Sequence, residues 1–170
     1  MNYTIKEGDN LGPGNNNWRK SNVIIRDEIT LKRENNTSAE VDFDFKGYGK
    51  YSFECEVPNL PKNVVFGIFL YADDQHEVDI EFSKWGFWFW PNCQFVIQPN
   101  EFKSYINRFW TFKKKFKGYI DWQEDYIEFN LNNRTKRINR KISKEMRFMI
   151  NLWSIKEDYN QTEVKIKCQI

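Results

Sequence analysis

Short runs in which apolar and polar residues alternate extend along most of the chain, and they constrain the fold more than any other feature. A β-strand places successive side chains on opposite faces, so each run is predicted to form a half-buried strand. Gly, Asn, Asp and Pro separate most of the runs, as turns between antiparallel strands require. The predicted strands are 23–26, 29–33, 40–45, 51–57, 64–72, 77–82, 94–98, 110–114, 119–122, 126–131, 135–138, 148–153 and 163–168.

The run VVFGIFLYA at 64–72 differs from the others because it is apolar on both faces. Such a run predicts a central strand that is covered on each side. The stretch 8–17, rich in Gly and Asn, is predicted to be a loop. Many short strands around a doubly buried one favour an all-β fold, an antiparallel two-sheet β-sandwich of the jelly-roll type. No linker or internal repeat divides residues 1–170, so a single domain is expected.

Charge and composition exclude several classes of function. With 26 basic and 24 acidic side chains the net charge is only +2, which argues against a nucleic-acid partner. The chain has one His, and Cys55, Cys93 and Cys168 are far apart, so neither a metal site nor a cofactor is expected. No apolar run is long enough to span a membrane, and the start of the chain lacks the apolar core of a signal peptide. We expect a monomer without a membrane partner.

Aromatic residues make up 18% of the chain, more than the core of one domain usually needs. Flat aromatic rings at a surface stack on flat ligands, such as sugar rings or bases. Because the net charge argues against nucleic acid, the aromatic content favours a carbohydrate.

Three carboxylates, Glu77, Asp79 and Glu81, alternate with apolar residues in the stretch EVDIEF. In a strand they share one face, where they could supply the acid, base and nucleophile that cleave a glycosidic bond. The chain repeats the pattern in EVDFDF, with Glu40, Asp42 and Asp44. Alternating acids more often mark only the solvent face of a strand. Spacing alone therefore leaves both interpretations open.

Several stretches together resemble glycoside hydrolase family 16, the family of lichenases and laminarinases. EVDIEF matches its Glu-x-Asp-x-Glu signature, and the resemblance runs in unbroken order from Asn15 to Trp153. The other similar stretches are NNNWRKSNVIIRDEITLKR (15–33), GYGKYSFECEVP (47–58), VVFGIFLYADDQ (64–75), IDWQEDYIEFNLNN (120–133) and RFMINLW (147–153).

The resemblance implies a concanavalin A-like jelly roll with a concave sheet, and hydrolysis with retention of configuration. By position, Glu77 would be the nucleophile, Glu81 the general acid/base, and Asp79 the acid that orients and tunes them. Like charges and aromatic cover are expected to raise the pKa of Glu81, and the three acids should titrate as a coupled group. The resemblance also suggests a structural calcium ion, but no cluster of ligands in the sequence supports one.

Further residues are candidates for substrate binding, and most of them also have an ordinary structural interpretation. Those that match the family by position are Asn15, Trp18, Glu40 and Trp153. Gln94 and Gln98 alternate on the strand after the acids, and Trp85, Trp88 and Trp90 follow the acids closely enough to stack on a sugar. A tryptophan can instead belong to the core, and an alternating Glu or Gln can simply face solvent.

The sequence departs from the family at His76, at Val96 and in the segment FSKWG at 82–86. Substrate preference therefore cannot be carried over, and the short chain predicts an open cleft. We expect a retaining, endo-acting hydrolase of β-linked, β-glucan-like polysaccharide or oligosaccharide. A non-catalytic carbohydrate-binding jelly roll and a transglycosylase are the alternatives. This substrate class favours an extracellular location.

Overall fold

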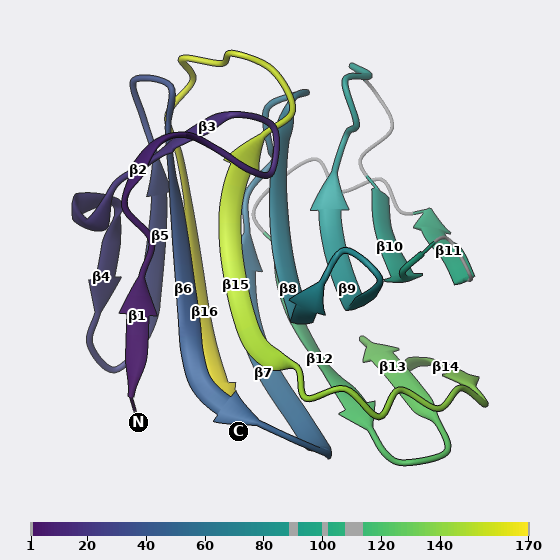
Figure 1. The fold of residues 1–170 in the computed structure, drawn as a ribbon. Coiled ribbons are helices and arrows are strands. Elements are labelled where there is room, and N and C mark those ends of the chain that lie inside the picture. The colour runs from purple at the N-terminus through teal and green to yellow at the C-terminus, as the bar shows by residue number, and fades with distance from the viewer. Residues whose placement is uncertain (1, 89–91, 100–101, 108–113, 170) are drawn as a thin grey trace.

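The computed structural model describes residues 2–88, 92–99, 102–107 and 114–169. Two sheets lie face to face, and they confirm the predicted jelly-roll sandwich (Figure 1). Within these ranges the one helical element is the 3₁₀ turn Lys20–Asn22.

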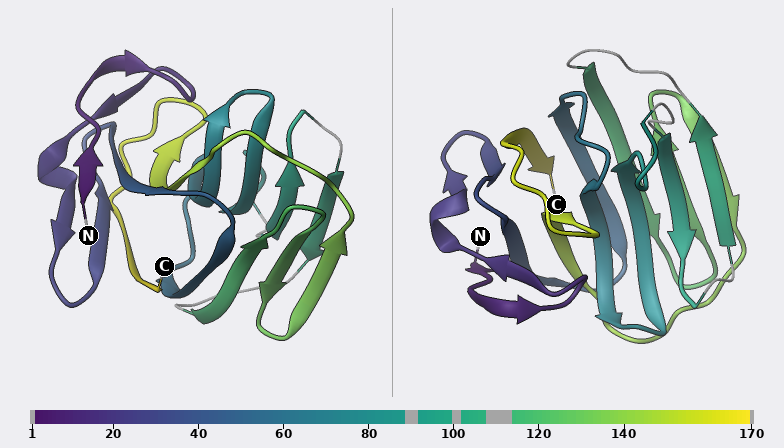
Figure 2. Two further views of the ribbon diagram at one scale, coloured as in Figure 1. Left: turned by 60° about the horizontal axis from the view of Figure 1, so that its bottom comes forward. Right: turned by 90° about the horizontal axis from the view of Figure 1, so that it is seen from above.

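In the first sheet, the strand that contains EVDIEF lies in the interior of the sheet, with a neighbour on each side. Its order is β11 (Phe102–Asn107), β10 (Asn92–Ile97), β9 (His76–Ser83), β8 (Val64–Asp73), β15 (Arg147–Ser154), β6 (Thr37–Lys46), β3 (Asn16–Trp18) and β2 (Gly8–Leu11), and β1 (Tyr3–Ile5) pairs with β6. The second sheet has the order β14 (Arg134–Ile138), β13 (Ile127–Leu131), β12 (Lys114–Trp122), β7 (Gly49–Val57), β16 (Thr162–Gln169), β5 (Ile29–Arg33) and β4 (Val23–Ile25). Figure 2 shows the two layers from two further directions.

Most predicted strands are confirmed, including the central position of 64–72, which is β8. The predicted strand 110–114 lies outside the described residues except for its last position. The prediction of a loop over 8–17 was wrong for β2 and for the first two residues of β3, and it holds for the turn between these strands. β3 pairs in parallel with β6, a departure from the antiparallel pattern. Apart from Trp18 its residues are polar, so local alternation gave no sign of a strand.

Aromatic rings join the two sheets in the core. Phe95 of β10 stacks on Phe129 of β13, with ring centroids 4.9 Å apart and planes 7° from parallel. Tyr51 of β7 stacks on Phe148 of β15 at 5.4 Å. Each buried large apolar side chain contributes roughly 1.5–3 kcal/mol to folding. Much of the aromatic excess thus serves the core, contrary to the expectation that it would mainly form a stacking surface.

Candidate active site

Strand β9 holds the three acids on one face and core residues on the other. Val78, Ile80 and Phe82 are fully buried between the sheets. β9 is paired on both sides, since Glu81 lies opposite Gly67 of β8 and opposite Gln94 of β10. The strict alternation in the sequence therefore places Glu77, Asp79 and Glu81 on the face of the first sheet that points away from the core.

A cavity of about 170 Å³ lies over these acids. Its lining combines the three carboxyl groups with aromatic, amide and backbone groups from the strands on either side and from the N-terminal turn. The lining residues are Pro13, Gly67, Phe69, Glu77, Asp79, Glu81, Gln98, Asn151 and Trp153. The structure thus brings together Glu77, Asp79, Glu81, Gln98 and Trp153 from the residues singled out in the sequence.

Asp79 is the most buried of the three acids, with 4% of its surface exposed. Burial first, and then the charges of Glu77 and Glu81, raise the pKa of Asp79 well above its ordinary value. The shift favours the protonated form of Asp79. Its side chain is hydrogen-bonded to Glu77, and the protonated Asp79 is the donor in that bond.

Glu77 has a raised pKa for related reasons. Burial, followed by the charge of Glu81, raises it to about 7, while the hydrogen bond from Asp79 opposes this shift by stabilising the carboxylate. The expected mutual influence of the acids is therefore confirmed for Glu77 and Asp79. The expected shift at Glu81 stays a prediction.

Gln94 orients Glu81. The Gln94 side chain is buried, and its Nε2 donates to Glu81 Oε2 at 2.5 Å. Gln98 lies at the other end of the acid row, where its backbone N–H donates to the Glu77 carbonyl oxygen at 3.0 Å. Gln94 is thus hydrogen-bonded to Glu81, and Gln98 lines the cavity beside Glu77.

Asn151 is a site residue that the sequence reasoning missed. Its Nδ2 donates to Glu40 Oε2 at 3.2 Å, and among the described residues its buried Oδ1 has no hydrogen-bond partner. Gly67 makes room for this amide, because a Cβ there would lie 2.6 Å from Asn151 Oδ1. Asn151 stands two residues before Trp153, and that spacing on one strand face was the signal available in the sequence.

Glu40 lies beside the cavity wall but has little contact with solvent. Its side chain is 6% exposed and forms an ion pair with Lys6, with Nζ 3.0 Å from Oε1. Burial raises the pKa of Glu40, and Lys6 opposes that shift. Glu40 therefore holds Asn151 in place, and the structure does not place it among the cavity-lining residues.

The N-terminal hairpin β2–β3 forms one wall. Asn16 fixes it by donating from Nδ2 to the Ser154 carbonyl oxygen at 2.9 Å and by accepting from Ser38 at 2.7 Å. Gly14, with φ of +67°, lies against the Trp153 ring, which a Cβ would approach to 3.1 Å. Asn15, with φ of +55°, is an exposed turn residue beside this contact.

Trp18 is not positioned to bind a sugar. It is fully buried, and its Nε1 donates to the Leu11 carbonyl oxygen at 3.1 Å. The burial of the ring within the hairpin contradicts the expectation of substrate contact.

Trp85 and Trp88, which follow the acids, are not among the residues that line the cavity. Trp85 is half-buried, with φ of +50° and its backbone N–H donating to Ser83 Oγ at 2.9 Å. Trp88 is 73% exposed, with Lys62 Nζ 4.7 Å from its ring centroid. Trp90 lies outside the described residues. A role in stacking on sugar stays a prediction for Trp85.

The described ranges contain no group of three or more His, Cys, Asp or Glu side chains arranged to hold a metal ion. In the same ranges, no helix has both the length and the apolar character needed to cross a membrane.

Comparisons with known proteins address the fold. No protein-family model matches the sequence, and no curated protein matches it. Among solved structures, the β-glucanase of Bacillus licheniformis is 20% identical, with a TM-score of 0.77 over 98% of this chain and 89% of that chain. The laminarinase of Flavobacterium sp. UMI-01 is 13% identical, with a TM-score of 0.76 over 98% and 91%.

A glycoside hydrolase family 16 endo-glucanase from Bacteroides ovatus, solved in complex with G4G3G-2F-DNP, is 12% identical. Its TM-score is 0.70, over 98% of this chain and 94% of that chain. The likeness covers nearly the whole of each protein, and it agrees with the order of blocks seen in the sequence. The chain therefore has the jelly-roll fold of the family 16 β-glucanases.

Proposed function

We propose that the protein is a retaining, endo-acting glycoside hydrolase that cleaves a β-linked, β-glucan-like polysaccharide. One observation carries the proposal: Glu77, Asp79 and Glu81 line one cavity, and the buried Asp79 is hydrogen-bonded to Glu77. A row of acids that only faced solvent would keep ordinary pKa values and would need no such cover. The fold shared with β-glucanases supports the same conclusion.

In the first step, a Glu77 carboxylate oxygen attacks C1 of the sugar. The bond between C1 and the leaving oxygen breaks, and Glu81 gives its proton to that oxygen, which leaves as a hydroxyl. Gln94 holds Glu81 for this transfer through its short hydrogen bond. Asp79 is a positioning residue, because its proton stabilises the Glu77 carboxylate that must attack.

In the second step, water hydrolyses the glycosyl–Glu77 ester. Glu81, now a carboxylate, takes a proton from the water, and the water oxygen attacks C1. The C1–Glu77 bond breaks, Glu77 returns as a carboxylate, and Glu81 again holds a proton. Configuration at C1 is retained because it is inverted twice.

The cavity contains further groups suited to a sugar. In the described chain, two buried acceptor oxygens of lining residues, Asn151 Oδ1 and Asp79 Oδ1, have no hydrogen-bond partner. A buried acceptor without a partner costs stability, which a hydroxyl donor from a ligand would recover. The Trp153 ring at the wall offers an apolar surface for the sugar ring.

The variant Glu77→Gln tests the proposal. It should lower the release of reducing ends from β-glucan by at least about a thousandfold, because the amide cannot act as the nucleophile. Glu163→Gln is the matched control, since Glu163 is an exposed residue of β16 in the other sheet. Circular dichroism should show the same fold for both variants. Undiminished activity in Glu77→Gln would remove Glu77 as the nucleophile.

A further inference from the structure

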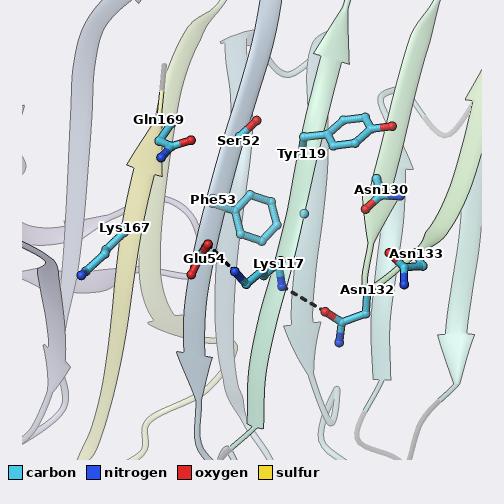
Figure 3. Close-up of a pocket in the computed structure, with 11 residues that line it drawn as sticks. Ser52, Phe53, Glu54, Lys117, Tyr119, Asn130, Asn132, Asn133, Lys167 and Gln169 are labelled. Atoms are coloured by element: carbon cyan, nitrogen blue, oxygen red, sulfur yellow. Dashed lines mark hydrogen bonds and ion pairs between the residues drawn. The ribbon is translucent and has the colours of Figure 1, made fainter.

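Besides the cavity over the acids, the structure has a groove on the second sheet, whereas the acids lie on β9 of the first sheet. The groove has a volume of about 690 Å³ and extends over β16, β7, β12 and β13 on their solvent-facing side (Figure 3). Cavities that bind small molecules are typically about 300–1,000 Å³. The groove is therefore large enough for a ligand of several sugar units.

Strand register builds the upper row of this groove. Gln169 of β16 lies opposite Ser52 of β7, Ser52 lies opposite Tyr119 of β12, and Tyr119 lies opposite Asn130 of β13. Figure 3 shows these four side chains side by side across the strands. Neighbouring strands are about 4.8 Å apart, so the row extends for roughly 14 Å.

The second row has the only charges of the groove lining. Glu54 lies between Lys167 and Lys117 in the register, and Lys117 Nζ is 2.6 Å from Glu54 Oε1. Because this pair cancels, Lys167 leaves a single net positive charge along the lining. That is too little for a polyanion such as nucleic acid, whose binding depends on many phosphate contacts.

Uncharged hydrogen-bonding groups dominate the remainder. Ser52 contributes a hydroxyl group to the lining, and Asn133 and Gln169 contribute side-chain amides. Asn130 uses its Nδ2 on Thr135 Oγ1 at 2.8 Å, which leaves its side-chain oxygen as an acceptor. Asn132 uses its Oδ1 on the Lys117 backbone N–H at 3.0 Å, which leaves its amide group as a donor.

Tyr119 supplies an aromatic surface that its neighbours hold in place. Its hydroxyl donates to Glu128 Oε1 at 2.7 Å, and Lys50 Nζ lies 3.6 Å from its ring centroid. Tyr119 lines the groove, whereas Lys50 does not. A fixed ring beside amide and hydroxyl groups is suited to a ligand with apolar ring faces and many hydroxyls.

We propose that this groove, lined by Ser52, Tyr119, Asn130, Asn132, Lys167 and Gln169, is a second binding site for a neutral glycan chain. The assignment of the glycan as the enzyme's own substrate rests on the proposed function. A site on the sheet opposite the cleft does not compete with catalysis. It would hold the enzyme on a polymer and raise the effective concentration of chain near the acids.

Titration of the ¹⁵N-labelled protein with β-glucan oligosaccharides, followed by NMR, is the first test. The side-chain amide signals of Asn130, Asn132, Asn133 and Gln169 should shift with saturation, and Tyr119→Ala should raise the dissociation constant at this site about twofold to tenfold. Gln169→Ala, at an exposed position, provides a second variant that removes one contact. Thr30→Ala on β5 is the matched control on the same sheet and should bind as the wild type does.

The outcomes separate this proposal from that of the active site. Shifts at the groove amides without any hydrolysis would support glycan binding in the groove and contradict the proposed hydrolase activity. Shifts confined to residues around Glu77 would overturn the proposal of glycan binding in the groove and would not affect the proposed hydrolase activity. In an active enzyme, Tyr119→Ala should reduce turnover of long polysaccharide but not of a short oligosaccharide. If Tyr119→Ala bound the oligosaccharides and turned over both substrates as the wild type does, the proposed glycan site in the groove would also be overturned.

Discussion

Lys6 and Glu40 form an ion pair, with 3.0 Å between Nζ and Oε1, at the junction between the N-terminal segment and the wall of the cleft. The same ammonium group donates to the Gly12 carbonyl oxygen at 2.7 Å and lies 4.4 Å from the Trp18 ring centroid. Lys6 thus connects the hairpin β2–β3 to Glu40, and Glu40 holds Asn151. This chain of contacts fixes one side of the cavity.

Replacement of Lys6 by Met should therefore destabilise the protein by about 1–3 kcal/mol. Removal of one partner leaves a buried carboxylate without a counter-ion, although the partial exposure of Lys6 moderates the loss. Chemical denaturation measures the change in the free energy of unfolding. Lys32→Met is the control, because the Lys32–Glu163 pair is exposed, with 3.8 Å between its atoms, and should contribute less than about 0.5 kcal/mol. Equal losses in the two variants would contradict the special role of Lys6.

Asp79 gives a prediction that depends on its being protonated. Asp79→Asn keeps a neutral side chain that can donate to Glu77, so the acid limb of kcat/KM should remain near pH 7, the pKa of Glu77. Asp79→Ala removes the donor that favours the Glu77 carboxylate. The acid limb of Asp79→Ala should move to higher pH by about one unit, because the Glu77 carboxylate loses one hydrogen bond, which contributes about 1.5 kcal/mol. Identical pH profiles for the two variants would show that the proton of Asp79 does not act on Glu77.

The raised pKa of Glu77 also makes stability depend on pH. The folded state binds this proton more tightly than the unfolded state, in which a Glu has a pKa of about 4.3. Stability from this group is therefore complete below about pH 4 and decreases as the pH rises through about 7. Glu77→Gln removes the effect, so it should be more stable than the wild type at pH 8 by about 2–4 kcal/mol and should differ little at pH 4. Thermal unfolding at the two pH values measures the difference, and a constant difference would contradict the shift.

Gly67 is predicted to be required for the position of Asn151. In Gly67→Ala the new Cβ would lie 2.6 Å from Asn151 Oδ1, so the amide must turn away and leave Glu40. We expect kcat/KM to decrease about tenfold, as one well-placed polar contact is lost. Gly49→Ala is the control, because its Cβ would have an ordinary 3.8 Å contact with Tyr51. A Gly67→Ala enzyme with unchanged KM and kcat would exclude Asn151 from substrate binding.

The sequence predicted features that arise from local periodicity. Alternation over 77–82 placed Val78, Ile80 and Phe82 in the core and the acids on the opposite face, as β9 shows. The central position of 64–72 followed from its apolar character on both faces. These predictions succeed because a strand fixes the direction of each side chain without reference to the remainder of the chain.

Features that depend on distant partners could not be predicted in this way. The hairpin β2–β3 is polar and is held by Asn16, which bonds Ser154 across 138 positions of sequence. Nothing near Trp18 in the sequence distinguishes a buried ring from one that faces the cleft. Asn151 and Gly67 belong to different strands, and only the register of β15 with β8 places the amide over the glycine.

The first product released from β-glucan tests the central claim most directly. Proton NMR during the first minutes of the reaction distinguishes the two anomers of the new reducing end before they interconvert. Double displacement through Glu77 predicts that the β-anomer forms first and the α-anomer appears only later, by mutarotation. Initial formation of the α-anomer, or the absence of any new reducing end with the wild-type protein, would contradict the account.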